Sequence, residues 1–375
     1  MSESICIICV PICVYLCIIM IKVAYVVKYY RPMPRISGIL RFVIDLIGAL
    51  ESDFSIRVFT YRYSPEAAPF EKCGEHEIFR LPAPFPFRAG RAVRKWDPDV
   101  IIFGSGFWRP YYLFPYWEAF RLGLRGCLRP VLLTQYTNMT EKHFGLIRLL
   151  APAPDGVITT TESLKVQWER YFPDRVTYIP PGMPIESSPP DSPEIADKPY
   201  RFRIGYFGHL QPHKGPDILL KVFQEINPDN ADLLINGVGE MEAELKTVAR
   251  GWDNITIQGY VPDVDPSLRS CDLLVMPYRS SVSVLGYSRA ALDALAMGIP
   301  VIGTPSPALE LLIEDGKNGF ICRDEAELKE RIRTLIDDPE LCARLSTGAL
   351  QSAKQYDIQL IAEQYRDLIK AVKDR

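Results

Sequence analysis

The sequence of 375 residues has no excess of positive charge and, after its first 17 residues, no cysteines at a metal-binding spacing. Its 43 Lys and Arg residues against 46 Asp and Glu residues give a formal net charge of −3, so the charge balance does not indicate a nucleic-acid partner. Five of the nine cysteines are scattered singly, which favours a reduced, cytosolic environment over a disulfide framework. These are Cys73, Cys127, Cys271, Cys322 and Cys342.

Residues 1–21 form an apolar N-terminal segment that is a possible membrane anchor. The run at 5–21 carries no charge and is interrupted only by Pro11. As a helix it would extend about 26 Å, close to the ~30 Å of a bilayer core. Basic residues follow it, so the rest of the chain would stay on the cytoplasmic side of the membrane. They are Lys22, Lys28, Arg31 and Arg35. A secretory signal is not expected, because no basic residue precedes the run.

Two other interpretations of this segment stay open. Translation can start at Met20, because a globular domain would begin cleanly at Ile21, and the protein would then be cytoplasmic. The segment can also be a buried extension of the first domain. Its four cysteines would lie along one side of a helix, where the outer two are roughly 16 Å apart and too distant to share a metal ion. We therefore expect apolar packing from Cys6, Cys9, Cys13 and Cys17.

From Val23 onward, short apolar runs alternate with helical patterns. Val23–Val27 predicts a buried strand, and residues 39–50 have apolar residues at helical spacing. Four further apolar runs predict a mostly parallel sheet. They are residues 56–60, 100–103, 131–134 and 156–160. Residues 81–87 are rich in proline and predict a loop.

A proline-rich stretch at residues 184–200 predicts a linker between two domains. The alternation of strands and helices restarts after it, so we assign residues 22–183 to a first domain and residues 201–375 to a second. The expected fold class is α/β, with two doubly wound Rossmann-like domains facing each other across a cleft, and the last helix can return to the first domain. Ligands of such sheets bind at the carboxyl ends of the strands, which makes the cleft the expected site.

A phosphate-binding loop is predicted at residues 205–215, which read Gly-Tyr-Phe-Gly-His-Leu-Gln-Pro-His-Lys-Gly. A strand ends there in glycine, and a loop with His209 and Lys214 opens into a helix. Glycine lets the backbone approach an anion, the first amides of the helix point toward it, and lysine supplies a positive charge. The plainer interpretation is a tight connection with Lys214 as a surface charge.

The order of these signals resembles the nucleotide-sugar glycosyltransferases of the GT-B fold, in particular glycosyltransferase family 4, over nearly the whole chain from residue 22. The resemblance implies that Lys214 and His209, which replaces the family's arginine, hold the donor diphosphate and act in catalysis. It further implies donor contacts from two glycine turns and from a segment that meets the nucleobase. These residues are Gly208, Gly237, Gly239, Tyr260 and Val261.

The family's signature is a pair of glutamates eight positions apart, and this chain has Leu285 and Asp293 at the matching positions. The resemblance implies that Asp293 binds the ribose hydroxyls, for which an acceptor carboxylate is sufficient. Backbone amides at the start of the following helix are expected to meet phosphate. They belong to Gly286, Tyr287 and Ser288. Leu285 cannot replace the carboxylate of the first glutamate, so the resemblance does not tell how the sugar ring of the donor would be bound.

The first domain is expected to contribute residues that contact the donor and residues that contact the acceptor. Gly38 matches the family's loop that approaches the donor phosphates, and Arg35 beside it is either an anion contact or a solvated surface charge. Many family members have a histidine after the strand that ends near residue 134. Tyr136 or His143 is our candidate to replace it on the acceptor side.

The resemblance implies a glycosyltransferase that moves a sugar from a nucleotide-sugar donor, its co-substrate, to a lipid-linked or cell-envelope glycan acceptor. No cofactor and no metal are expected, because Lys214 and helix amides would stabilise the leaving diphosphate and Asp263 and Asp265 suit a turn and a helix start. A retaining outcome is implied by the resemblance alone. An aromatic tract at residues 107–117 with nearby arginines suits a membrane surface or a core. Two alternatives stay open, a catalytically degenerate GT-B scaffold and a nucleotide-sugar epimerase.

Overall fold

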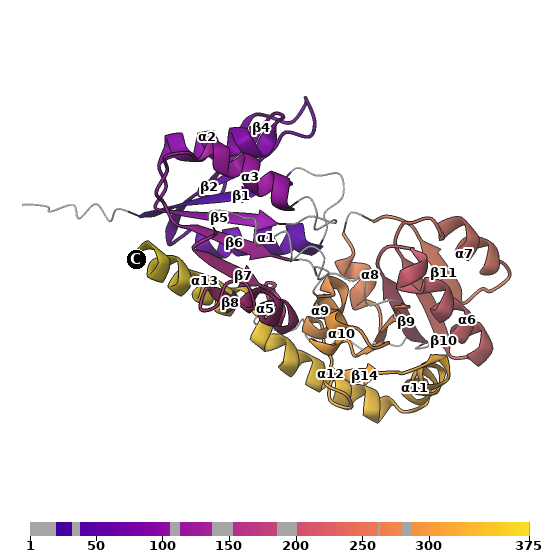
Figure 1. Ribbon diagram of the computed structural model, residues 1–375. Helices are drawn as coiled ribbons and strands as arrows, with labels where there is room; N and C mark the ends of the chain where they lie inside the picture. The colour runs from indigo at the N-terminus through magenta and orange to yellow at the C-terminus, as the bar shows by residue number, and fades with distance from the viewer. Residues whose placement is uncertain are drawn as a thin grey trace, which may run out of the picture.

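Two separate β-sheets divide the chain into two α/β domains in the computed structural model (Figure 1). The structure describes residues 20–374 apart from a set of short gaps. The gaps are residues 32–37, 106–112, 137–152, 186–200, 262 and 280–286.

The first sheet has eight strands in the order β3-β4-β2-β1-β5-β6-β7-β8. The strands are β1 (Ile21–Val27), β2 (Phe54–Tyr61), β3 (Phe70–Cys73), β4 (His76–Leu81), β5 (Val100–Ser105), β6 (Val131–Gln135), β7 (Gly156–Thr159) and β8 (Val176–Tyr178). All neighbours pair in parallel except β3 and β4. The parallel strands are short and apolar because helices cover both of their faces.

The helices of the first domain form two layers around this sheet. Side chains of β1 alternate between the layers, with Val23 and Tyr25 on one face and Ala24 and Val26 on the other. The first face is covered by α1 (Gly38–Leu50) and α13 (Ile358–Lys373), and the second by α2 (Phe85–Trp96), α3 (Leu113–Gly123) and α5 (Glu162–Glu169).

The structure corrects the loop predicted at residues 81–87. Strand β4 extends to Leu81, and α2 already begins at Phe85. Pro84 occupies the N-cap and Pro86 the first turn, where a missing N–H breaks no helical hydrogen bond. The prolines therefore start a helix here instead of forming an extended loop.

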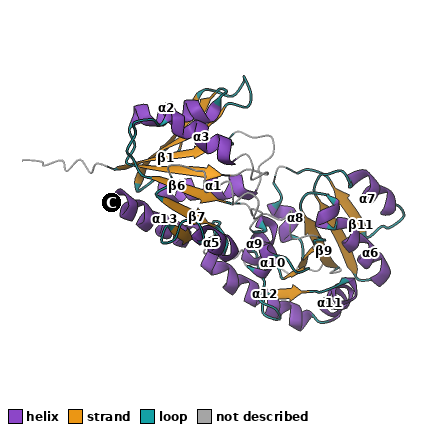
Figure 2. Ribbon diagram, in the orientation of Figure 1, coloured by secondary structure: helices purple, strands orange, loops and turns teal. Residues whose placement is uncertain are grey.

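The second sheet has six parallel strands in the order β11-β10-β9-β12-β13-β14. The strands are β9 (Phe202–Phe207), β10 (Ala231–Asn236), β11 (Ile255–Gln258), β12 (Leu273–Met276), β13 (Val301–Gly303) and β14 (Gly319–Ile321). Helices surround them, as the colours of Figure 2 show. They are α6 (Pro216–Ile226), α7 (Glu242–Val248), α8 (Asp265–Arg269), α9 (Arg289–Ala296), α10 (Pro307–Glu310), α11 (Glu325–Asp337) and α12 (Pro339–Ala353), with short 3-10 turns η2 (Pro212–Lys214) and η3 (Lys354–Tyr356).

The last helix, α13, follows the second domain in sequence but packs against α1 of the first (Figure 1). Arg366 on α13 donates to Asp53 at 2.7 Å and to the Ala49 carbonyl at 3.0 Å. Just before α13, Met183 exchanges backbone hydrogen bonds with the segment around Tyr356. The predicted fold class, two doubly wound parallel-sheet domains, is confirmed.

The predicted apolar segment at residues 1–21 falls almost entirely outside the described residues, apart from Met20 and Ile21. Among the helices that the structure describes, none combines the length and apolar character needed to cross a membrane. The predicted linker also lies mostly in a gap, at residues 186–200.

Candidate functional site

The predicted phosphate loop joins the carboxyl end of β9 to the start of α6. Gly215 ends the loop with a φ of 67°, and a Cβ atom there would lie 2.0 Å from the Pro277 carbonyl oxygen. Only glycine fits both the left-handed backbone and this close approach. The loop is therefore held tightly against the end of β12, the strand beside β9.

Lys214 is the cation that the loop presents. Its ammonium nitrogen lies 4.2 Å from the centroid of the Tyr278 ring, and no carboxylate among the described residues pairs with it. Burial lowers the pKa of Lys214 to about 8, because a charge is harder to hold away from water. A partly buried ammonium group that no described carboxylate neutralises is well suited to receive an anion.

Two histidines precede this lysine in the same loop. His209 is exposed, and its carbonyl oxygen accepts a hydrogen bond from the Tyr206 hydroxyl at 2.9 Å. The pKa of His213 is lowered by burial and by the nearby positive charge of Lys214. His213 was not among the predicted site residues, although it directly precedes Lys214 in the sequence.

The predicted donor-binding glycines bring two loops together. A Cβ at Gly237 would lie 1.8 Å from the Gly208 carbonyl oxygen, and one at Gly239 would lie 2.2 Å from the Leu210 carbonyl oxygen. The amides of Gly208 and Gly237 already donate to the carbonyl oxygens of Asn236 and Gln258. These glycines therefore shape the loop by close backbone contact, and their direct contact with a donor stays a prediction.

The predicted base-binding segment follows β11. The Tyr260 side chain is 51% exposed, and Val261 is half-buried. Asn236 at the end of β10 donates to the Gln258 side chain at 3.2 Å and to the Gly259 carbonyl at 3.3 Å. Asn236 thus orients this segment, although it was not among the predicted site residues.

The start of α9 meets the first domain. Ser288 is the N-cap, and its hydroxyl accepts from the Ala291 amide at 3.4 Å. The Tyr287 hydroxyl donates to the Gly38 carbonyl oxygen at 3.0 Å. Tyr287 and Gly38, both predicted to contact the donor, therefore contact each other directly between the two domains. Gly286 lies outside the described residues.

Asp293 forms part of a charge cluster instead of presenting a free carboxylate. Arg289 donates to Asp293 at 2.7 Å and lies 3.2 Å from Asp45 on α1 of the first domain. Arg41 adds a second contact to Asp45 at 3.5 Å. A Cβ at Gly38 would lie 2.7 Å from the Cβ of Arg289. Ribose binding by Asp293 stays a prediction, and this cluster between the domains was not foreseen.

On the acceptor side, the structure does not support the choice of Tyr136. Its side chain is fully buried in the first domain, and its hydroxyl lies 2.6 Å from that of Tyr25. Tyr136 is a core residue because it follows β6 on the face that packs against α1 and α13. The other two candidates, Arg35 and His143, lie outside the described residues.

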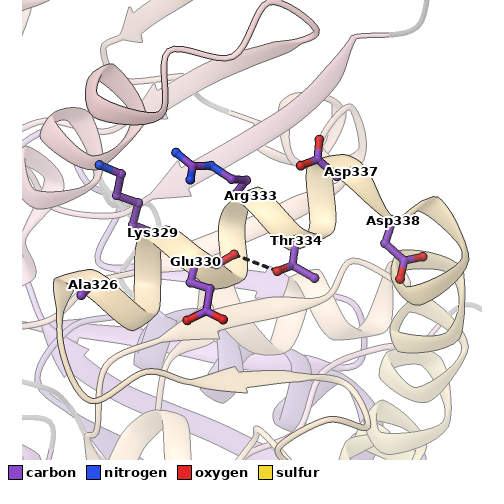
Figure 3. A pocket seen from close by; sticks show the side chains of 7 residues that line it. All are labelled: Ala326, Lys329, Glu330, Arg333, Thr334, Asp337 and Asp338. Carbon is purple, nitrogen blue, oxygen red and sulfur yellow. Dashed lines mark hydrogen bonds between the residues drawn. The ribbon is translucent and has the colours of Figure 1, made fainter.

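A surface hollow runs along α11, away from these residues (Figure 3). Its lining comes from α11 and the residue after it. It consists of Ala326, Lys329, Glu330, Arg333, Thr334, Asp337 and Asp338. None of the predicted site residues lines it, so we place the candidate site at the carboxyl ends of β9 and β12. In the described part of the chain, His, Cys, Asp and Glu side chains form no cluster of three that could hold a metal ion.

Comparisons with known proteins bear on this geometry. Residues 201–338 match the family model described as Glycosyl transferases group 1. An uncharacterized glycosyltransferase of Haemophilus influenzae is 28% identical over 224 residues, 57% of this chain and 61% of that protein. A GDP-mannose-dependent monoacylated alpha-(1-6)-phosphatidylinositol monomannoside mannosyltransferase of Corynebacterium glutamicum is 24% identical over 378 residues, 90% of this chain and 95% of that protein.

A solved structure shares the fold. Anabaena HepE in complex with UDP has a TM-score of 0.71 at 18% identity, and the alignment covers 94% of this chain and 100% of that one. The chain spans less than two thirds of the length of the Haemophilus relative. The predicted resemblance is confirmed: the chain has the GT-B fold and resembles glycosyltransferase family 4, and residues 201–338 match the model of the group 1 glycosyl transferases.

Proposed function

We propose that this protein transfers a sugar from a nucleotide-sugar donor to a lipid-linked or cell-envelope glycan acceptor, without a metal ion. The observation that carries the proposal is Lys214, an ammonium group without a carboxylate partner among the described residues, in a glycine-closed loop at the carboxyl end of β9. HepE, with the same fold, has been solved with UDP and with UDP-glucose. The Corynebacterium relative is named for a GDP-mannose donor and a phosphatidylinositol mannoside acceptor.

The chemistry follows from where negative charge develops. When the bond between the sugar and the diphosphate breaks, the leaving nucleoside diphosphate gains charge on its terminal phosphate. A cation fixed at that position stabilises the transition state more than the ground state. Lys214 supplies this cation, and the amides at the start of α9 supply further donors beside it.

The first test is binding of the donor. Isothermal titration calorimetry with UDP-, GDP- and ADP-sugars is expected to reveal at least one ligand, and the same ligand is expected to raise the unfolding temperature. Transfer of the sugar to a lipid extract, or slow hydrolysis of the donor, then tests catalysis. Binding of none of these nucleotides would contradict the proposal.

A second candidate function is a catalytically degenerate GT-B protein that binds a nucleotide sugar or a partner. Two observations favour it. Leu285 replaces the first signature acid, and the Asp293 carboxylate is engaged by Arg289. This candidate predicts donor binding without transfer or hydrolysis, so the same two measurements separate it from the enzyme.

We also propose that the protein works at the cytoplasmic surface of an anionic membrane, where a lipid-linked acceptor resides. Helix α2 has four basic side chains and no acidic residue. They are exposed, form no ion pair within the described residues, and are Arg88, Arg91, Arg94 and Lys95. Arg94 also donates to the Arg125 carbonyl at the end of neighbouring α3, where Leu122 is 63% exposed and Leu128 is 97% exposed. Basic and apolar side chains together suit the interface of an anionic bilayer.

Vesicle co-sedimentation tests this membrane surface. Replacement of all four basic residues of α2 by Gln is expected to lower binding to phosphatidylglycerol-containing vesicles by up to about 1000-fold, because each such cation is worth roughly 1 kcal/mol near an anionic bilayer. The matched control replaces four exposed cations of the second domain and α13. These are Arg333, Arg344, Lys370 and Lys373. Equal loss in both variants would contradict a specific surface.

A further inference from the structure

Tyr278 lies just beyond the end of β12 and was not among the predicted site residues. Its side chain is 6% exposed, and its ring faces the ammonium group of Lys214 at 4.2 Å. A cation within about 6 Å of a ring centroid is attracted by the electron-rich face of the ring. Tyr278 therefore contacts the cation on which the proposed donor site depends.

Hydrogen bonds fix this ring from both ends. The Tyr278 hydroxyl lies 3.2 Å from the hydroxyl oxygen of Ser288, the N-cap of α9. The Tyr278 carbonyl oxygen accepts from the Thr304 hydroxyl at 2.6 Å, and its amide donates to the Met276 carbonyl at 3.0 Å. The ring thus has one defined position between the loop after β9 and the start of α9.

A fixed aromatic ring restricts the conformations of the Lys214 side chain. A lysine side chain is long and flexible, and fixing it costs rotamer entropy. A carboxylate would hold the ammonium group but also neutralise it, whereas an aromatic face holds it and leaves its charge available. No described residue offers Lys214 a carboxylate, so the ring is the contact that orients it.

We propose that Tyr278 is a positioning residue of the donor site: its ring holds Lys214 toward the donor diphosphate, and its hydroxyl ties this support to the N-terminus of α9. The inference rests on the proposed function, because it assumes that Lys214 meets the diphosphate. It goes beyond that function by naming the side chain that keeps two anion-binding elements, Lys214 and the amides of α9, in a fixed relation.

Two substitutions separate the ring from the hydroxyl. Tyr278→Leu removes the ring and keeps an apolar side chain, and we expect it to raise the dissociation constant of UDP three- to thirtyfold, the range of a partly desolvated cation–π contact. Tyr278→Phe keeps the ring but loses the hydroxyl contact with Ser288, and we expect it to raise this constant by a smaller factor, about two- to threefold. Tyr356→Leu is the matched control, because Tyr356 is a buried tyrosine of the same core cluster with its hydroxyl on the Leu311 carbonyl. It is expected to lower stability and leave UDP affinity unchanged.

The unliganded protein gives a second readout that a purely structural tyrosine would not affect. In protein labelled with ¹³C at lysine Cε, the ring current of Tyr278 is expected to shift the Lys214 methylene protons upfield. Loss of this signal in Lys214→Arg assigns it. The shift is expected to persist in Tyr278→Phe and to disappear in Tyr278→Leu.

The outcomes are distinguishable. An unshifted Lys214 resonance in the wild-type protein overturns the proposal, even if Tyr278→Leu fails to fold. Loss of UDP affinity in Lys214→Ala, but not in folded Tyr278→Leu, overturns the positioning role alone. If Lys214→Ala binds UDP as tightly as the wild type, the diphosphate does not lie at Lys214. The donor-site role of Tyr278 is then overturned as well, even where the shifted Lys214 resonance shows that the ring contacts the lysine.

Discussion

The Tyr287 hydroxyl donates a hydrogen bond to the Gly38 carbonyl oxygen at 3.0 Å, across 249 positions of sequence. The bond joins the start of α9 in the second domain to the start of α1 in the first. Both residues were predicted from the sequence as donor contacts. Their direct contact links the relative position of the domains to the shape of the predicted donor site.

Tyr287→Phe is expected to loosen this junction. One buried hydrogen bond contributes about 0.5–1.5 kcal/mol, and its loss leaves the Gly38 carbonyl without this donor. Hydrogen exchange measured by mass spectrometry should therefore be faster in the first turns of α1 and α9. Tyr63→Phe is the control, because the Tyr63 hydroxyl makes no hydrogen bond within the described residues. Equal exchange in Tyr287→Phe and the wild type would contradict the link.

Arg289 is expected to be the most sensitive charge between the domains. Arg289→Met leaves Asp293 and Asp45 without this cation, and their side chains are only 15% and 10% exposed. Removing one partner of a buried ion pair typically costs 3–5 kcal/mol, so we expect the free energy of unfolding to fall by about 4 kcal/mol. Urea unfolding measures the loss.

Two further variants test whether the stability lost in Arg289→Met comes from the carboxylates that it leaves without a cation. Arg289→Met/Asp293→Leu should recover part of the lost stability, because it also removes an uncompensated carboxylate. Arg129→Met breaks an exposed pair with Asp97 and should leave the free energy of unfolding nearly unchanged, because water and salt screen exposed charges. A cost for Arg289→Met no greater than for Arg129→Met would show that the cluster contributes little.

The glycines of the loop are expected to differ sharply in their tolerance of alanine. Gly237→Ala places a methyl group 1.8 Å from the Gly208 carbonyl oxygen at a φ of 154°, so the two loops must separate. We expect a loss of about 2–4 kcal/mol in the free energy of unfolding. Gly208→Ala meets its nearest atom at 3.4 Å and should cost less than about 1 kcal/mol. Thermal unfolding of both variants checks this order, and similar losses would contradict it.

Most of the strands and helices could be predicted from the sequence, because apolar runs and helical spacing reflect burial directly. Val23–Val27 and residues 39–50 are examples, since their apolar residues face the core. The loop predicted at residues 81–87 is wrong, because proline alone does not distinguish a loop from the start of a helix. The same residue type is favoured in the first turn of a helix, and α2 begins there.

The candidate site was predicted less completely, because it depends on contacts between distant segments. Glycine spacing and Lys214 identified the loop after β9. The contact of Tyr278 with Lys214 and the pairing of Arg289 with Asp45 could not be read from the sequence, because each joins separate elements. Tyr136 was misplaced for the same reason: a polar tyrosine after a strand gives no sign of whether it faces a substrate or the core.

The stability of the protein is expected to reflect the buried charge of Lys214. The folded pKa of about 8 lies below the ordinary value of 10.5, so between these pH values the unfolded chain binds more protons and stability rises with pH. Below pH 8 the charged lysine lowers stability. Lys214→Met should therefore raise the free energy of unfolding at pH 7, by up to about 3 kcal/mol. It should also abolish the rise between pH 8 and 10.5, and a variant less stable than the wild type would contradict this.

The most direct test of the account is the affinity of UDP for the wild-type protein and for Lys214→Met, measured by calorimetry at pH 7 and pH 9.5. A hydrogen bond to a charged group contributes about 1.5–3 kcal/mol, so the variant is expected to bind UDP about 10- to 150-fold more weakly at pH 7. The wild type should lose affinity at pH 9.5, as Lys214 loses its proton, and the variant should not. Equal affinities of the two proteins at pH 7 would contradict the placement of the donor diphosphate at Lys214.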